Sequence, residues 1–141
     1  MRRDPQAGSA AVEVALIAPG LLVLMALLIF GGRNALATGA VEQAAVDAAR
    51  AASLARTAAD ADIAASDAAE RSLADQDLAC STISVDIDSD GFSTQPGQAA
   101  RVTTTITCTL RLSDLALPGI PGSKTIAASA VSVIDTYRER Q

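Results

Sequence analysis

The chain has no histidine or tryptophan, and its 141 residues include one Tyr, two Phe and two Cys. Without histidine it lacks the usual proton shuttle and the commonest zinc ligand, and so few aromatic rings give no platform for stacked bases. The 11 Lys and Arg are scattered among 16 Asp and Glu, whereas nucleic-acid binding needs clustered cations. We therefore expect no enzyme, cofactor, small-molecule substrate or nucleic-acid partner.

An uncharged apolar segment dominates the N-terminal part. It runs from Val14 to Gly32, 19 residues, and ends at Arg33. As a helix it is about 28 Å long, close to the ~30 Å hydrocarbon core of a bilayer. Arg2 and Arg3 precede it, and cationic flanks stay cytoplasmic. The sequence thus predicts a single-pass membrane protein, with its N-terminus in the cytoplasm and residues 34–141 outside.

The two cysteines, Cys80 and Cys108, both fall on the expected outer side, where thiols can oxidise. Two thiols without histidine cannot fill a four-coordinate zinc site within one chain. We expect a disulfide between them, and two unpaired buried thiols are the alternative.

Helical patterns fill residues 9–79. One helix is expected from Ser9 to about Thr57, bent or partly unwound over residues 15–20 by Pro19 and Gly20. A second helix would end near Ala79, with Asp60 or Asp67 as its N-cap. A helical stripe joins residues that are mostly Ala: Val41, Ala45, Ala48, Ala52, Ala55, Ala59 and Ile63.

A period of two replaces the helical period after Cys80. Ile83, Val85 and Ile87 alternate with polar residues, and a longer run places six side chains on one face: Val102, Thr104, Ile106, Cys108, Leu110 and Leu112. A third strand is expected over about 124–136, after a loop at 117–122. The fold class is α+β, with three antiparallel strands in chain order and the Ala-rich helix on one face.

The segment GSAAVE at residues 8–13 carries the strongest functional signal, because the apolar run follows it directly. A Gly, small residues and an acid five residues past the expected cleavage point resemble the processing signal of type IV pilin precursors. The longer string GSAAVEVALIAPGLLVLMALLIFGGR resembles the start of TadE-like proteins of the tight-adherence (Tad) pilus apparatus.

The resemblance implies that a prepilin peptidase cuts between Gly8 and Ser9, and that other pilins and the Tad assembly platform are partners in adhesion or secretion. It divides the chain into a leader (1–8), an assembly helix (9–33), an Ala-rich helical region (34–79) and an outer β domain (80–141). A 133-residue product with an outer domain fits a minor pilin or pseudopilin. Val14 replaces the ring that usually follows the acid in this family.

Glu13 has a physical role that does not depend on the resemblance. A carboxylate at the edge of a spanning helix is costly unless it is paired, and the α-amine of a neighbouring processed subunit is a suitable partner. Such a pair would set the register between stacked helices. In the alternative interpretation, Glu13 only marks the polar end of an anchor.

Two weaker signals remain. The first half of a calcium-binding loop is present in Asp86, Asp88, Asp90 and Gly91. Gly97, however, occupies the position where such a loop has a bidentate Glu ligand. The other interpretation is an acidic turn in which Gly91 has a positive φ. An A-x-A sequence at residues 35–37 would let signal peptidase release a soluble protein. An anchored outer binding domain unrelated to pili is the remaining alternative.

Overall fold

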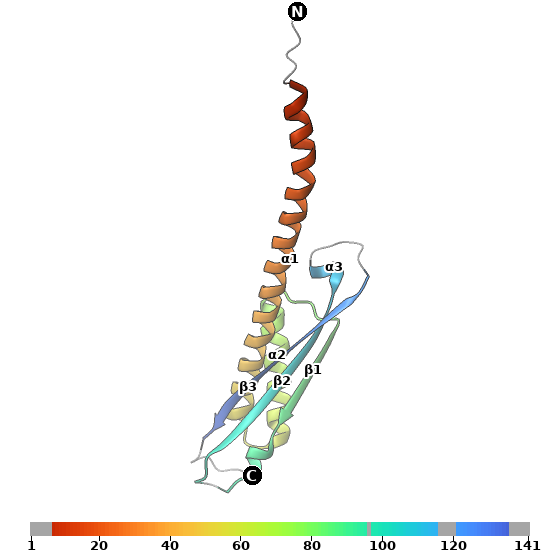
Figure 1. The fold of residues 1–141 in the computed structure, drawn as a ribbon. Coiled ribbons are helices and arrows are strands. Elements are labelled where there is room, and N and C mark those ends of the chain that lie inside the picture. The colour runs from red at the N-terminus through yellow and green to blue at the C-terminus, as the bar shows by residue number, and fades with distance from the viewer. Residues whose placement is uncertain (1–6, 96, 116–120, 136–141) are drawn as a thin grey trace, which may run out of the picture.

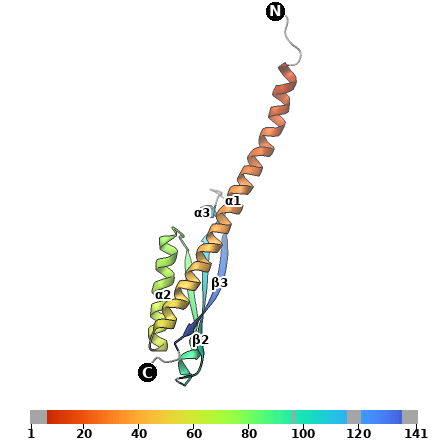
Figure 2. The same ribbon diagram turned by 90° about the vertical axis from the view of Figure 1, so that its left-hand side faces the viewer.

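The computed structural model describes residues 7–95, 97–115 and 121–135. A helix of 48 residues, α1 (Ala7–Leu54), forms the axis of the molecule. Its N-terminal half extends alone, and its C-terminal half packs with a second helix, α2 (Ala58–Asp75), and a three-stranded sheet (Figures 1 and 2). The predicted α+β class, with a long apolar N-terminal helix and an antiparallel sheet, is confirmed.

Helix α1 continues through Pro19 without interruption, so the expected unwinding of residues 15–20 is wrong. Proline fixes φ near its helical value and removes one main-chain hydrogen bond, whereas unwinding would release several bonds in a segment suited to lipid. The helix also begins earlier than expected, at Ala7, which places Gly8 in its first turn.

The chain reverses between α1 and α2 at residues 55–57, and Thr57 caps the second helix. Thr57 has extended backbone angles (φ −125°, ψ 159°), and its Oγ1 accepts a hydrogen bond of 3.0 Å from the main-chain N–H of Asp60. The proposed caps Asp60 and Asp67 are therefore wrong, because both lie inside α2. Helix α2 ends at Asp75, before the expected Ala79, and Asp77 adopts a positive φ of 54° that turns the chain away.

The reversal divides the predicted alanine stripe. Its α1 members are buried up to Ala52, but Ala59 and Ile63 in α2 are exposed. Helix α2 buries a different face, formed by Ala61, Ala65, Ala69, Ser72 and Leu73. A single helical period cannot predict the buried face of a second helix, because the turn between two helices resets the phase.

The sheet contains β1 (Thr82–Asp88), β2 (Ala100–Arg111) and β3 (Ser123–Ile134), in the order β1-β2-β3 with both pairs antiparallel. The predicted face of β2 is confirmed for five of its six members, since the alternate side chains from Val102 to Leu110 are buried. The prediction is wrong for Leu112, because β2 ends at Arg111 and the chain turns into a short helix there. Helix α1 lies against β2 and β3 on this face. Buried Thr104 donates its hydroxyl proton to the carbonyl oxygen of Ala45 at 2.9 Å, which attaches the sheet to α1.

A single turn of 3₁₀ helix, η1 (Asp90–Ser93), follows β1. Gly91 does not have a positive φ, contrary to the prediction; Gly97 does, at 93°. Glycine is needed at position 91 because a Cβ there would lie 2.2 Å from the carbonyl oxygen of Arg101. A short helix, α3 (Leu112–Leu115), leaves β2, and the main-chain N–H of Leu112 donates to Gly122 O at 3.0 Å.

Candidate functional site

The N-terminal half of α1 exposes its apolar side chains on every side. Leu16 and Leu22, for example, are 74% and 71% exposed. This helix is long and apolar enough to cross a membrane, with a mean hydropathy of 2.7 in its most apolar window and none of that window buried. Exposed apolar surface around a whole helix needs lipid or other helices to cover it.

The C-terminal half of the same helix is part of a folded core. Ala37, Val41, Ala44, Ala48 and Ala52 are at most 3% exposed. Alanine side chains let α2 and the sheet approach the α1 backbone closely. One continuous helix therefore connects the apolar segment directly to the folded domain, with no linker between them.

Glu13 is exposed on the N-terminal half of α1 and is the single ionisable residue between Ser9 and Gly32. Positions 9 and 13 are four residues apart and share a helix face, about 6 Å apart along the axis. The amine that cleavage would free on Ser9 thus lies about one helical turn before the Glu13 carboxylate along α1. Neighbouring copies shifted by one helical turn would bring the two groups together.

The Gly8–Ser9 bond lies in the first turn of α1. The first four N–H groups of a helix have no partner within the helix, so helix ends fray readily. A protease that needs extended substrate would open this turn at lower cost than any turn further along α1.

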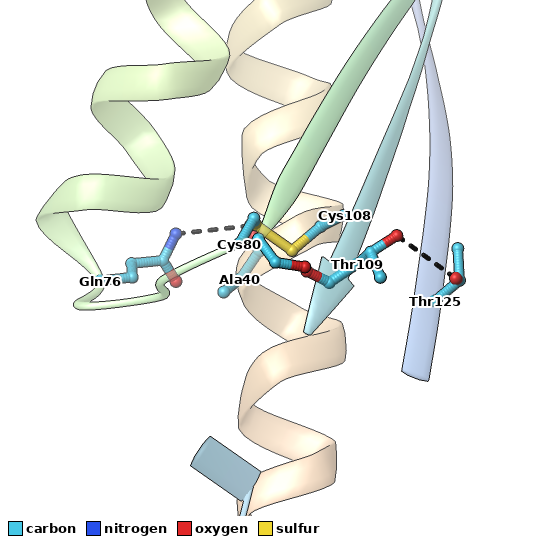
Figure 3. The surroundings of a disulfide bond; sticks show 7 residues. Ala40, Gln76, Cys80, Cys108, Thr109 and Thr125 are labelled. Atoms are coloured by element: carbon cyan, nitrogen blue, oxygen red, sulfur yellow. Dashed lines mark hydrogen bonds between the residues drawn. A yellow bond between two sulfur atoms is a disulfide. The ribbon is translucent and has the colours of Figure 1, made fainter. Parts of the chain in front are cut away.

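Cys80 and Cys108 form the predicted disulfide, with their Cα atoms 5.5 Å apart (Figure 3). The bond attaches the α2–β1 connection to the fully buried Cys108 of β2. Next to it, the main-chain N–H and the hydroxyl of Ser81 both donate to the carbonyl oxygen of Thr109, at 2.7 and 2.8 Å. The disulfide thus fixes the start of β1, an edge strand.

The calcium candidate gains no support from the described residues. Asp86 and Asp88 lie on the exposed face of β1, and residues two apart on a strand are about 6.6 Å apart along it. The Oδ1 of Asp88 accepts a hydrogen bond of 3.2 Å from the main-chain N–H of Asp90. Among the described residues no three His, Cys, Asp or Glu side chains are placed to hold a metal ion.

A polar groove between α1 and α2 was not predicted from the sequence. Asp47 accepts hydrogen bonds from the amide of Gln43 at 3.0 Å and from the hydroxyl of Ser72 at 2.8 Å. Arg71, Asp75 and Gln76 complete the lining. The bond from Ser72 connects the two helices and the bond from Gln43 orients the Asp47 carboxylate within α1, so this groove has a structural explanation. The i,i+4 spacing of Gln43 and Asp47 was the available sequence signal.

Comparison with known proteins identifies the N-terminal segment. Residues 8–50 match the model of the TadE-like protein family. The match confirms the resemblance over the GSAAVE motif at residues 8–13, the exposed apolar half of α1 and most of its buried half. Helix α2 and the sheet lie outside the matched residues. No curated protein and no solved structure matches the chain.

Proposed function

We propose that the chain is a minor pilin or pseudopilin of a Tad pilus, and that it acts in assembly for adhesion or secretion and has no catalytic role. The match of residues 8–50 to TadE-like proteins carries the proposal. The exposed apolar half of α1 supports it, because pilin-type assembly needs a helix that is stable in lipid and can pack against other helices. Other pilins and the assembly platform are the proposed partners.

Processing is the first step of the proposal. The N-terminus lies in the cytoplasm, a prepilin peptidase cuts after Gly8, and the outer domain remains on the far side of the membrane. The position of this bond in the first turn of α1 supports cleavage here, since only terminal helical hydrogen bonds need to open.

Glu13 is proposed to set the register between subunits. Among lipid tails or packed helices, an ionised carboxylate without a partner is costly, and the Ser9 amine of an adjacent processed subunit removes that cost. The same requirement penalises copies in the wrong register. Glu13 would therefore specify how neighbouring helices align more than how tightly each one is anchored.

The release of a soluble domain by signal peptidase is the less favoured alternative. Cleavage after Ala37 would fall in a helix that continues unbroken to Leu54, and Ala37 is itself only 3% exposed. The cut would remove a buried residue from the core of the released product. The continuity of α1 thus favours retention of the apolar segment.

The assembly role is tested in cells that carry the complete pilus apparatus, with Glu13→Gln as the variant. We expect normal cleavage to a Ser9 start, but at least a tenfold loss of co-purification with other pilins after mild crosslinking, about 1.4 kcal/mol. Glu42→Gln is the matched control, because Glu42 is an exposed glutamate of the same helix beyond the apolar segment. Equal co-purification of both variants would contradict the register role.

A further inference from the structure

The end of the sheet nearest the apolar segment lies at a fixed position along α1. The Nζ of Lys124, at the start of β3, donates a hydrogen bond to the Oδ1 of Asn34. Arg111, at the end of β2, pairs with Ser123 in the β2–β3 register. These strand ends and α3 are the parts of the folded domain closest to the free half of α1 (Figures 1 and 2). The uncharged stretch of α1 ends at Gly32, and Arg33 separates it from Asn34.

This end of the domain carries three cations, although the outer part as a whole is acidic. Residues 33–141 contain 9 Lys and Arg against 14 Asp and Glu, a net charge of −5. Arg33 and Arg111 are exposed and Lys124 is half-buried. The sequence also places one acid, Asp114, in α3. Cations thus outnumber acids at this end, in contrast to the domain as a whole.

The nearest acids of α2 lie further from the apolar segment. The amide of Gln76, directly after α2, donates to the carbonyl oxygen of Ala40 at 3.5 Å, so the end of α2 is level with Ala40. Ala40 follows Asn34 by six residues, about 9 Å along a helix. Asp75, the last residue of α2, is therefore about one Debye length beyond the level of Asn34.

We propose that Arg33, Arg111 and Lys124 form a headgroup-binding end that contacts anionic phospholipids of the membrane crossed by α1. The inference rests on the proposed insertion of the apolar half of α1. Guanidinium groups donate paired hydrogen bonds to phosphate oxygens, and an ammonium has three donors, of which Lys124 uses one on Asn34.

Charge selects anionic lipid as the partner. A negatively charged surface repels a domain of net charge −5, and it attracts only that end of the domain where cations predominate. The attraction acts within about 10 Å of the lipid surface, a range that includes the cations at the level of Asn34, and it weakens toward Asp75. The three cations would thus hold the domain upright on the membrane.

The test uses the full chain in vesicles and a single tryptophan, since the sequence has none. Ser123→Trp places the probe at an exposed position beside Arg111. We expect quenching by lipids spin-labelled at the headgroup to be at least twofold stronger with about 30% phosphatidylglycerol than in phosphatidylcholine alone. The difference should disappear in about 0.5 M NaCl.

In this background, Arg111→Gln with Lys124→Gln should abolish the dependence on anionic lipid, and Arg111→Gln alone, which preserves the contact to Asn34, should reduce it. Arg101→Gln is the matched control: Arg101 is exposed on the same face of β2, ten residues or about 33 Å away. Equal quenching in both vesicles, or an equal loss from the control, would overturn the proposal.

Leu24→Trp separates this proposal from membrane insertion, because Leu24 is exposed within the apolar half of α1. Lipids brominated near the bilayer centre should quench this probe whatever the headgroup charge. If the probe at position 24 is quenched but the probe at position 123 does not respond to anionic lipid, headgroup binding is refuted and membrane insertion stands. Absence of quenching at position 24 contradicts insertion, and lipid binding with it.

Discussion

Removal of the disulfide should destabilise the folded domain formed by the second half of α1, α2 and the sheet by about 3.6 kcal/mol. Cys80 and Cys108 are 28 positions apart, and closing a loop of this length lowers the entropy of the unfolded chain by that free-energy equivalent. Replacing both residues with Ala avoids burying a hydroxyl at position 108, which is fully buried. The loss is a large fraction of the stability of a small domain.

The assay is urea unfolding of the full chain in detergent micelles, followed by the far-ultraviolet signal of the domain. Wild type treated with a reductant should converge on the stability of the Cys80→Ala/Cys108→Ala variant, and the variant itself should not respond to reductant. Because β1 is an edge strand fixed by the disulfide, removal of the bond should speed the exchange of β1 amide protons more than that of β2 amide protons. A loss below about 1 kcal/mol, or unchanged exchange in β1, would refute the reasoning.

The helical packing leads to two further predictions. Ala48→Leu inserts a large side chain at a fully buried position of α1, so it should destabilise the domain by about 1–3 kcal/mol in the same unfolding assay. The control, Ala74→Leu at an exposed position of α2, should change stability by less than about 0.5 kcal/mol. Thr57→Ala removes the acceptor for the Asp60 N–H and should cost about 1 kcal/mol, while Thr57→Ser should retain most of the stability; equal losses in these two variants would contradict the capping role.

The sheet was predictable because its signal is local. The alternation from Val102 to Leu110 identifies the buried face of β2 without knowledge of its neighbours. Chain order and short connections then favour a meander of three antiparallel strands. The disulfide followed from the presence of just two cysteines on the expected outer side.

The wrong predictions are those in which two local structures compete, because a sequence pattern does not give their relative free energies. Pro19 stays helical because one lost hydrogen bond costs less than several. Thr57, and neither of the two proposed aspartates, caps α2, since the cap is decided by where the chain reverses. Gly91 is required by the close approach of Arg101 across the hairpin, a contact that sequence spacing does not contain.

The candidate site shows the same division. The motif at residues 8–13 is contiguous, so sequence alone located it, and the family match includes it. The hydrogen bond from Ser72 to Asp47 joins α2 to α1 across 25 positions and could not be predicted from a helical period. The partner proposed for Glu13 is the Ser9 amine of another subunit, so its position depends on assembly and does not follow from one sequence.

The most direct test of the central claim is the N-terminus of the native protein. Intact mass and N-terminal sequencing would be carried out on protein from its own membrane, for the wild type and for Gly8→Ala. Pilin processing predicts a chain that starts at Ser9 in the wild type and keeps residues 1–8 in the variant. A native start at Thr38 would indicate a secreted domain, and a retained Met1 a simple anchor; either result would contradict the account.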